Sequence, residues 1–184
     1  MRRVVSGVNL QSTDFELFGL PTRFSQDPAG LVSRWKDLQR EAHPDKFAAQ
    51  GAAAQRIAMQ WSARINEAYQ RLKDPMKRAA YLCELHSAPV NAENNTAMPR
   101  EFLMTQMMWR EALDDAVSID DLTKLAREVA QARQESLSQC EHLIDVEHDY
   151  AGAVGKVRAL MFIERFGSDV DSRLERMDSS EQGQ

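Results

Sequence analysis

The sequence predicts an all-α fold built from two helical domains. Two long stretches carry residues at steps of three and four that share one face of a helix. The first is an apolar stripe from Ile57 to Leu72, and the second is a bundle seam from Leu122 to Glu147. Between them, residues 87–96 contain many turn-forming residues and show no helical period. This stretch is typical of a linker between two domains.

Composition and length limit the classes of function. The chain has 184 residues, of which 43% are hydrophobic and 28% are charged, as in a soluble globular protein. No window approaches the roughly 18 consecutive apolar residues that cross a membrane. The basic start of the chain is not followed by an apolar stretch long enough for a secretory signal. We therefore expect a cytoplasmic protein with no membrane partner.

Charge is distributed unevenly along the chain. Residues 1–75 carry 11 Lys and Arg against 8 Asp and Glu, a net charge of +3, whereas residues 76–184 carry 12 against 20, a net charge of −8. Two parts of opposite charge suggest two different partners. The acidic majority argues against general nucleic-acid binding.

The first predicted helix is short. It spans residues 12–21, with Ser12 or Thr13 as its cap and Gly19 near its end. Asp27 then caps a second helix. The second and third helices should pair as an antiparallel hairpin through one apolar face each, and a further short helix should follow at residues 76–85. The two faces comprise Leu31, Trp35, Leu38 and Ala42 on the second helix, and Ile57, Trp61, Ile65, Ala68 and Leu72 on the third.

The second helix runs into the tripeptide His43-Pro44-Asp45. Proline disfavours the helical conformation for the residue before it, so the helix should end at about His43. Pro44 also fixes its own φ angle, which should hold a short, stiff corner. We expect His43 and Asp45 to project from it. Lys36 and Arg40 form a like-charged i, i+4 pair, which suggests docking to an acidic surface, although an ordinary solvated helix face is the alternative.

The order of these features resembles the J-domain of DnaJ-type co-chaperones. The resemblance rests on a helix, the tripeptide, and a second helix that contains Ile65–Leu72 and is followed by Lys73–Pro75. The longer string Leu38–Phe47 resembles HscB, the J-protein dedicated to iron–sulfur cluster biogenesis. The resemblance implies that the corner binds a heat-shock chaperone of the HscA type and stimulates its ATPase. The implied chaperone-binding residues are His43, Pro44, Asp45, Lys46, Lys36 and Arg40.

The helix predicted from Pro99 to about Val117 has two apolar faces. One face, which includes Phe102 and Trp109, should meet the rest of its domain. A second apolar face is either buried or offered to a partner. Methionine suits a partner surface because its side chain is adaptable, but it also fills irregular cores. The second face comprises Leu103, Met104, Met107 and Met108, followed by Glu111 and Asp115.

In the HscB family this helix carries the site for the iron–sulfur scaffold protein of the IscU type. The resemblance therefore implies that this second face binds the scaffold, with Met108 at a position that is often acidic in relatives. Phe162 matches a further contact, and it could equally be a core aromatic. The implied scaffold-binding residues are Leu103, Met104, Met107, Met108, Glu111, Asp115 and Phe162.

The remaining helices should complete an antiparallel three-helix bundle. A capping-box-like start at Ser118 opens a long helix that ends near His148. The last helix should run from about Tyr150 to beyond Leu174, with Gly167 as a possible irregularity. The predicted boundaries are a J-domain at 1–75, a connecting helix and linker at 76–97, a scaffold-binding domain at 98–178 and a disordered tail at 179–184.

Two other functions stay open. One is a general J-protein for unfolded clients, although no glycine-rich or cysteine-rich module follows the tripeptide. The other is a metal-binding helical bundle, because Asp145 and His148 resemble half of a carboxylate-bridged site, although a second such pair is missing. Cys83 and Cys140 should be separate thiols near core faces. We expect no catalytic activity, no cofactor and no bound metal.

Overall fold

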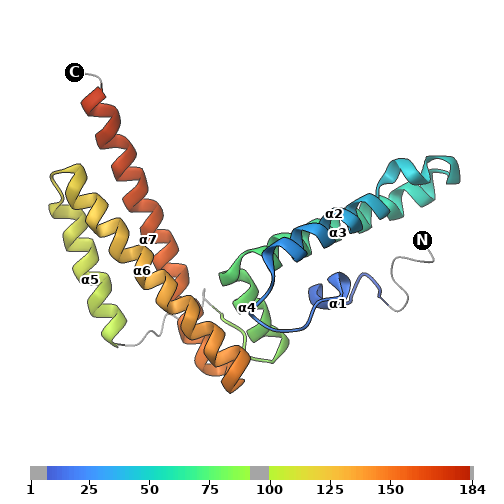
Figure 1. Ribbon diagram of the computed structural model, residues 1–184, viewed down its shortest axis with the longest axis horizontal. Coiled ribbons are helices and arrows are strands. Elements are labelled where there is room, and N and C mark those ends of the chain that lie inside the picture. The colour runs from blue at the N-terminus through green and yellow to red at the C-terminus, as the bar shows by residue number, and fades with distance from the viewer. Residues whose placement is uncertain (1–7, 92–99, 183–184) are drawn as a thin grey trace. The chain divides into compact units, whose positions relative to one another are not determined.

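The computed structural model describes residues 8–91 and 100–182, and every regular element in these ranges is a helix (Figure 1). The chain divides into two compact units, with the boundary between Leu82 and Cys83. The predicted all-α fold is confirmed. Within the described ranges, no helix has the length and hydrophobicity that a membrane span requires.

The first unit is a helical hairpin accompanied by shorter helices. The long helices α2 and α3 pack along each other, and the 3-10 helix η1 joins them at the tip (Figure 1). The unit boundary falls inside the last helix, α4, which matches the predicted helix at residues 76–85. The elements are α1 (Asp14–Phe18), α2 (Pro28–Glu41), η1 (Pro44–Gln50), α3 (Ala52–Lys73) and α4 (Pro75–Leu85).

Side chains cap the first two helices as the sequence predicts. Thr13 is the cap of α1, because its side chain accepts the N–H of Glu16 while the Glu16 carboxylate accepts the N–H of Thr13. Gly19 ends α1 in the left-handed conformation, with a φ of 64°. Asp27 caps α2 through two backbone N–H groups of its first turn. Both helices therefore begin where their polar side chains satisfy the free N–H groups.

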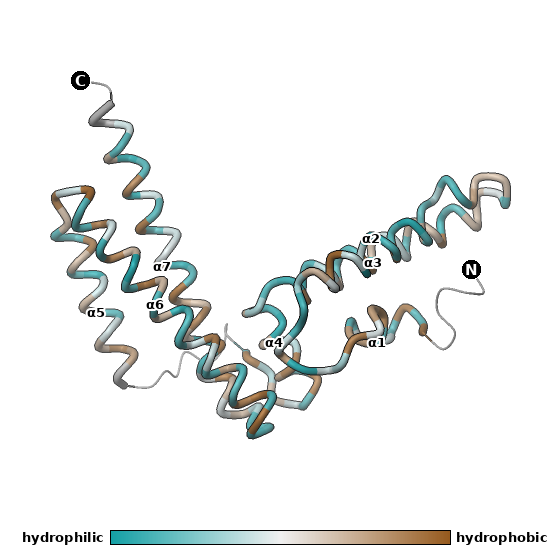
Figure 2. The backbone as a smooth tube through the Cα atoms, viewed as in Figure 1, coloured by the Kyte–Doolittle hydropathy of each residue, from teal (hydrophilic) through white to brown (hydrophobic). Residues whose placement is uncertain are grey.

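The hairpin core lies between the apolar faces of α2 and α3. Leu38, Ile65 and Leu72 are almost completely buried, and Trp35 stacks on Tyr69 with ring centroids 4.6 Å apart. Figure 2 shows hydrophobic residues recurring along each helix with hydrophilic residues between them, which is typical of helices that bury one face.

The predicted stripe on α3 is wrong at its first position. Ile57 is 46% exposed, and its neighbour Ala58 is completely buried. Because α2 ends at Glu41, the first turns of α3 pack against η1 instead. Contact with η1 in place of α2 accounts for the shift of the buried position from Ile57 to Ala58.

A buried carboxylate ties α1 to α3. Asp14 is completely buried, and its oxygens lie 2.6 Å from Arg64 and 3.0 Å from Arg71. Its backbone N–H donates to the hydroxyl of Tyr81, over whose ring the Arg71 guanidinium lies. Three helices therefore meet at one charged group, because an unpaired buried carboxylate would be strongly destabilising.

The second unit is a three-helix bundle. α6 and α7 run side by side in opposite directions, and α5 lies against α6 (Figure 1). Its core cluster is formed by Trp109, Leu125, Val129, Ile163, Phe166 and Val170. The elements are α5 (Arg100–Asp115), α6 (Ile119–Glu141), the π-helix η2 (His142–Glu147) and α7 (Tyr150–Gln182). Pro99, the predicted start of the first of these helices, lies outside the described residues.

The predicted seam is wrong in its last part. Cys140, a residue of the predicted seam, is buried as expected, whereas Glu147, the last residue of the seam, is exposed and Ile144 is buried. The chain forms a π-helix from residue 142, and its wider turn changes which residues face the bundle. The helical segment still ends at His148, which has a φ of 56°.

Two expectations about α7 are also wrong. Gly167 is no irregularity, because α7 is continuous there and Gly167 faces Val129 closely enough that a Cβ would lie 3.5 Å from its Cγ1. The tail predicted to be disordered from residue 179 is helical as far as Gln182. The Ser179 hydroxyl donates to the carbonyl of Glu175, so this polar residue is accommodated within the helix.

Part of the predicted linker is attached to the second unit. Val90 is buried, and its carbonyl accepts two hydrogen bonds from the Arg158 guanidinium at 2.9 and 2.7 Å. This contact fixes the chain shortly after α4. Residues 92–99, which complete the predicted linker, lie outside the described residues.

Candidate functional site

The His43-Pro44-Asp45 corner projects from the end of the hairpin. α2 ends at Glu41, and His43 has an extended backbone that opens η1. The side chains of His43 and Asp45 are 58% and 89% exposed. The His43 ring nitrogen Nδ1 accepts the backbone N–H of Asp45, so a neutral ring carries its proton on Nε2. The corner therefore offers a donor and a carboxylate to a partner.

Contacts beneath the corner hold it in place. Phe47 is the buried residue of η1, which packs against α3, and the Ser62 hydroxyl donates to the carbonyl of Ala42 at the end of α2. The Gln39 amide in turn donates to the carbonyl of Ser62. Both ends of the corner are thus joined to α3, which restricts its backbone.

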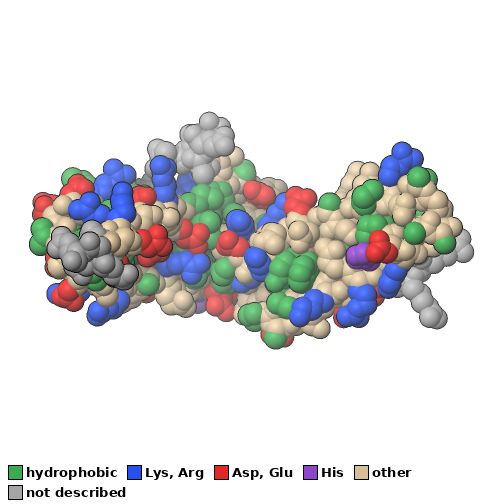
Figure 3. All heavy atoms as spheres, turned by 90° about the horizontal axis from the view of Figure 1, so that it is seen from above, with side chains coloured by type: hydrophobic (Ala, Val, Ile, Leu, Met, Phe, Trp, Pro, Cys, Tyr) green, Lys and Arg blue, Asp and Glu red, His purple; other side chains and the backbone are tan. Residues whose placement is uncertain are grey.

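Exposed basic residues accompany the corner. Lys36, Arg40 and Lys46 are all exposed, and Arg40 lies 3.1 Å from the Asp37 carboxylate. This ion pair offsets the repulsion between Lys36 and Arg40. Figure 3 shows a histidine beside an acidic side chain in the part of the view that holds the hairpin, with basic side chains close by. The structure thus exposes the side chains expected to bind the chaperone.

The second apolar face of α5 is exposed. We call Leu103, Met104, Met107 and Met108 the methionine ridge. Met104 and Met107 are 61% and 73% exposed, while Trp109 on the opposite face is buried. The alternative that these methionines fill the core is therefore wrong. A contiguous apolar surface of this kind is typical of a binding site. Glu111 and Asp115 are exposed on the same helix.

Phe162 was expected to be either a scaffold contact or a core aromatic, and the structure shows that it packs on the core while staying partly exposed. Its ring meets Phe102 edge-on at 5.7 Å and stacks on Phe166 at 5.9 Å, so it contributes to the bundle core. It is nevertheless only partly buried, and it lines a cleft between α5 and α7. A partner can therefore reach one side of the ring.

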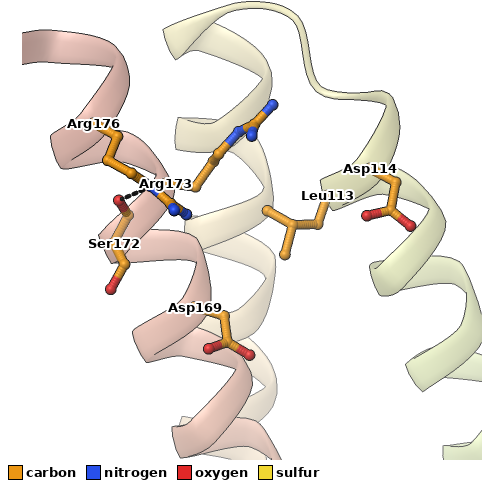
Figure 4. A pocket seen from close by; sticks show the side chains of 6 residues that line it. All are labelled: Leu113, Asp114, Asp169, Ser172, Arg173 and Arg176. Atoms are coloured by element: carbon orange, nitrogen blue, oxygen red, sulfur yellow. Dashed lines mark hydrogen bonds between the residues drawn. The ribbon is translucent and has the colours of Figure 1, made fainter.

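This cleft is a feature that the sequence did not predict. It consists of two adjoining hollows of about 390 and 330 Å³ between α5 and α7, which share Leu113, Asp114 and Asp169. Figure 4 shows the hollow nearer the C-terminus, where the Arg176 side chain donates to the carbonyl of Ser172. The sequence feature that could have indicated the cleft is a row of residues at steps of three and four on α7, several of which are arginines.

The residues considered for a metal site do not converge. Among the described residues, no group of three or more His, Cys, Asp or Glu side chains is placed to hold a metal ion. His148 directs Nδ1 to the carbonyl of Ile144 at 3.0 Å, and His142 lies 3.0 Å from Glu147. Within the described part of the chain, Asp145 and His148 thus do not belong to a group of three or more potential metal ligands.

The two cysteines are buried and free. Burial raises the pKa of the Cys83 thiol to about 11 and that of Cys140 to about 12. The Cys83 thiol donates to the carbonyl of Tyr150 at 3.6 Å. Because the reactive form is the thiolate, neither residue has the environment of an activated nucleophile.

Known proteins resemble this chain over most of its length. The family model described as the HSCB C-terminal oligomerisation domain matches residues 98–171. The co-chaperone protein HscB homolog of Burkholderia mallei is 45% identical over 174 residues, which cover 93% of this chain and 99% of that protein.

Solved structures agree with the sequence relatives. Chaperone HscB from Vibrio cholerae has a TM-score of 0.78 and 32% identity, and the match covers 90% of this chain and 99% of that one. Human co-chaperone protein HscB shares the fold, with a TM-score of 0.81 at 23% identity over 93% of this chain and 84% of the human chain. The chain therefore belongs to the HscB family of co-chaperones.

Proposed function

We propose that this co-chaperone stimulates the ATPase of a heat-shock chaperone of the HscA type and delivers an iron–sulfur scaffold protein of the IscU type to it. We place this activity in the cytoplasm. The observation that carries the proposal is that one chain exposes two chemically different surfaces in two compact units. The first is the polar corner at His43 and Asp45, and the second is the methionine ridge.

The corner suits a charged contact with the chaperone. A carboxylate as exposed as that of Asp45 can form a charge-assisted pair with an arginine of the partner. His43 can donate a hydrogen bond from Nε2 in the same contact. Lys36, Arg40 and Lys46 would attract an acidic surface and raise the association rate.

The methionine ridge suits the scaffold. Its exposed side chains offer apolar area that a partner can bury, and unbranched methionines can adapt to the surface that covers them. Glu111 and Asp115 lie on the same helix and would fix the register through polar contacts. A few central side chains should carry most of the binding free energy.

Joining the two sites in one chain gives the mechanism. When the co-chaperone holds the scaffold, binding of the corner to the chaperone brings scaffold and chaperone together at a high effective concentration. The chaperone then meets its client at the moment when its ATPase is stimulated.

The test replaces the imidazole of the corner. His43→Gln should abolish stimulation of the chaperone ATPase and leave the calorimetric affinity for the scaffold unchanged. His142→Gln is the matched control, because this exposed histidine lies in the other unit, and it should stimulate like the wild type. Equal stimulation by His43→Gln and the control would refute the proposal.

A further inference from the structure

The cleft between α5 and α7 has an apolar floor and runs along the middle part of α7. Leu113, Phe162 and Phe166 form the floor, and all three pack against the bundle core. The lining residues of α7 extend from Phe162 to Arg176, a length of about 21 Å at about 1.5 Å per residue. A cleft of this length can hold an extended or helical segment of a partner.

Arginines surround this floor, and we call the whole feature the arginine cleft. Arg110 contributes from α5, and Arg165, Arg173 and Arg176 contribute from α7. These are four of the 12 basic residues in residues 76–184, a region with a net charge of −8. Asp114 and Asp169 also line the cleft, so basic groups outnumber acidic ones by two to one. The cleft is therefore locally basic within an acidic region.

The arginines are not neutralised from within the chain. Among the described residues, none of the four guanidinium groups lies within ion-pair distance of a carboxylate, although two aspartates line the same cleft. On another face of the bundle, Arg133 does pair with Glu164 at 2.9 Å. The planar guanidinium matches carboxylates particularly well. The cleft thus offers several unpaired cations around an apolar floor.

The arginine cleft borders the methionine ridge. At about 100° per residue, Arg110 and Asp114 lie roughly 60° and 20° from Met107 around α5. One helix therefore presents the ridge and, directly beside it, one wall of the cleft. Phe162, which was assigned to the scaffold contact, lines the same cleft. A partner that covers the ridge would reach the cleft without crossing another surface.

We infer that an acidic segment of the scaffold protein binds in the arginine cleft, with an apolar side chain on its floor and carboxylates beside Arg110 and Arg165. This inference rests on the proposed function, because it assumes that the scaffold covers the ridge. It adds a specificity contact, since the ridge recognises apolar area and the cleft recognises negative charge.

The test reverses charge in the cleft. Arg165→Glu should weaken calorimetric scaffold binding roughly tenfold, and adding Arg110→Glu should weaken it further, because both carboxylates would repel the segment. Arg165→Lys, which keeps the positive charge but loses the planar guanidinium, should weaken binding less than Arg165→Glu. The matched control is Arg127→Glu, an exposed position on α6 that lines neither hollow, and it should change the affinity less than about threefold.

Salt dependence and folding complete the test. The affinity of Arg165→Glu should depend less on salt than that of the wild type, because fewer ion pairs remain to be screened. Circular dichroism should show the same helicity in all variants. If Arg165→Glu binds like the control while Met104→Ala with Met107→Ala binds weakly, the arginine cleft is refuted and the proposed function stands. If neither the cleft nor the ridge variant loses affinity, both are refuted.

A second copy of the chain is the competing occupant. Sedimentation of the wild type and of Arg165→Glu distinguishes it, because the scaffold model expects the same mass for both. Loss of a dimer in Arg165→Glu with unchanged scaffold affinity would overturn the inference.

Discussion

The first unit exposes polar groups on a short 3-10 helix, whereas the second exposes apolar groups on the outer face of a regular helix. His43 and Asp45 depend on the backbone at the corner for their directions, since hydrogen bonds to Ser62 join the α2 side of the corner to α3 and η1 packs against α3 on the other side. The methionine ridge depends only on helical periodicity and leaves its side chains free to adapt. The comparison teaches that the same chain presents a rigid polar surface and an adaptable apolar one, which suits the two different contacts that we propose for them.

The stability of the first unit, which carries the rigid corner, should depend strongly on the buried carboxylate of Asp14. Asp14→Asn should destabilise the first unit by about 3 kcal/mol, because Arg64 and Arg71 lose their buried partner. We take the low end of the usual range because the two arginine side chains are 18% and 33% exposed. Hydrogen exchange should show faster opening of α1 and α3 and unchanged protection of α6 and α7.

Asp37→Asn is the matched control for this change. It removes an exposed ion pair with Arg40 and should cost less than about 1 kcal/mol. Unchanged exchange in Asp14→Asn would mean that the buried carboxylate does not stabilise the hairpin. Equal loss of protection in both units would instead show that the two units unfold together and are not independently stable.

Mutations in the methionine ridge should lower the affinity for the scaffold without lowering the stability of the protein. Met104→Ala with Met107→Ala should weaken scaffold binding by at least about 2 kcal/mol and change the free energy of unfolding by less than about 0.5 kcal/mol. The reason is that both side chains are mostly exposed and support no core. Calorimetry and urea titration measure the two quantities. Val117→Ala is the control, since this residue is 83% exposed and lies outside the ridge; its scaffold affinity should not change.

The sequence predicted those features that depend on local chemistry or on a single helical period. Thr13, Gly19 and Asp27 end or cap helices where expected, and the exposure of the corner follows from Pro44. The alternation of Met107 and Trp109 between two faces of α5 correctly separated the ridge from the core.

The features that the sequence did not predict require contacts between distant segments. Nothing local to Asp14 indicates that two arginines 50 and 57 positions later will enclose its carboxylate. The seam failed where a π-helix changed the period, which a fixed step of 3.6 residues cannot reproduce. The arginine cleft lies between α5 and α7, so it can be predicted only when the packing of these two helices is known.

The cap of α6 offers a smaller test within the second unit. Ser118→Ala should destabilise the bundle by about 1 kcal/mol, because the Ser118 hydroxyl both accepts the Asp121 N–H and donates to its carboxylate. Thermal unfolding measures the loss. Ser138→Ala, at an exposed position inside α6, should leave the stability nearly unchanged.

The same cap predicts a pH dependence. The hydrogen bond from Ser118 lowers the pKa of Asp121 below its ordinary value of 3.8. The pKa of Asp121 is therefore lower in the folded state than in the unfolded state. The stabilisation that its carboxylate provides is complete above the ordinary pKa and is lost as the pH falls through the folded pKa. The difference between Ser118→Ala and the wild type should shrink in that acidic range, and a constant difference would contradict the role of the carboxylate.

The two buried thiols should show the smallest effect. A pKa of about 11 for Cys83 means that roughly one thiol in a thousand is ionised at pH 8, and Cys140 is ionised still less. Both should therefore react slowly with a thiol reagent in the folded protein and rapidly in urea. Rapid labelling of either cysteine without denaturant would show that the second unit opens more readily than its packing indicates.

The most direct measurement is the ATPase rate of the HscA-type chaperone with the scaffold and an equal mixture of two defective co-chaperones. One is His43→Gln, and the other carries Met104→Ala with Met107→Ala. If one chain must present both sites, the mixture should stimulate the ATPase no more than the Met104→Ala, Met107→Ala variant does alone. It should also stimulate far less than the wild type at the same total concentration. Stimulation by the mixture at the wild-type rate would contradict the account, because the two sites would then work equally well on separate molecules.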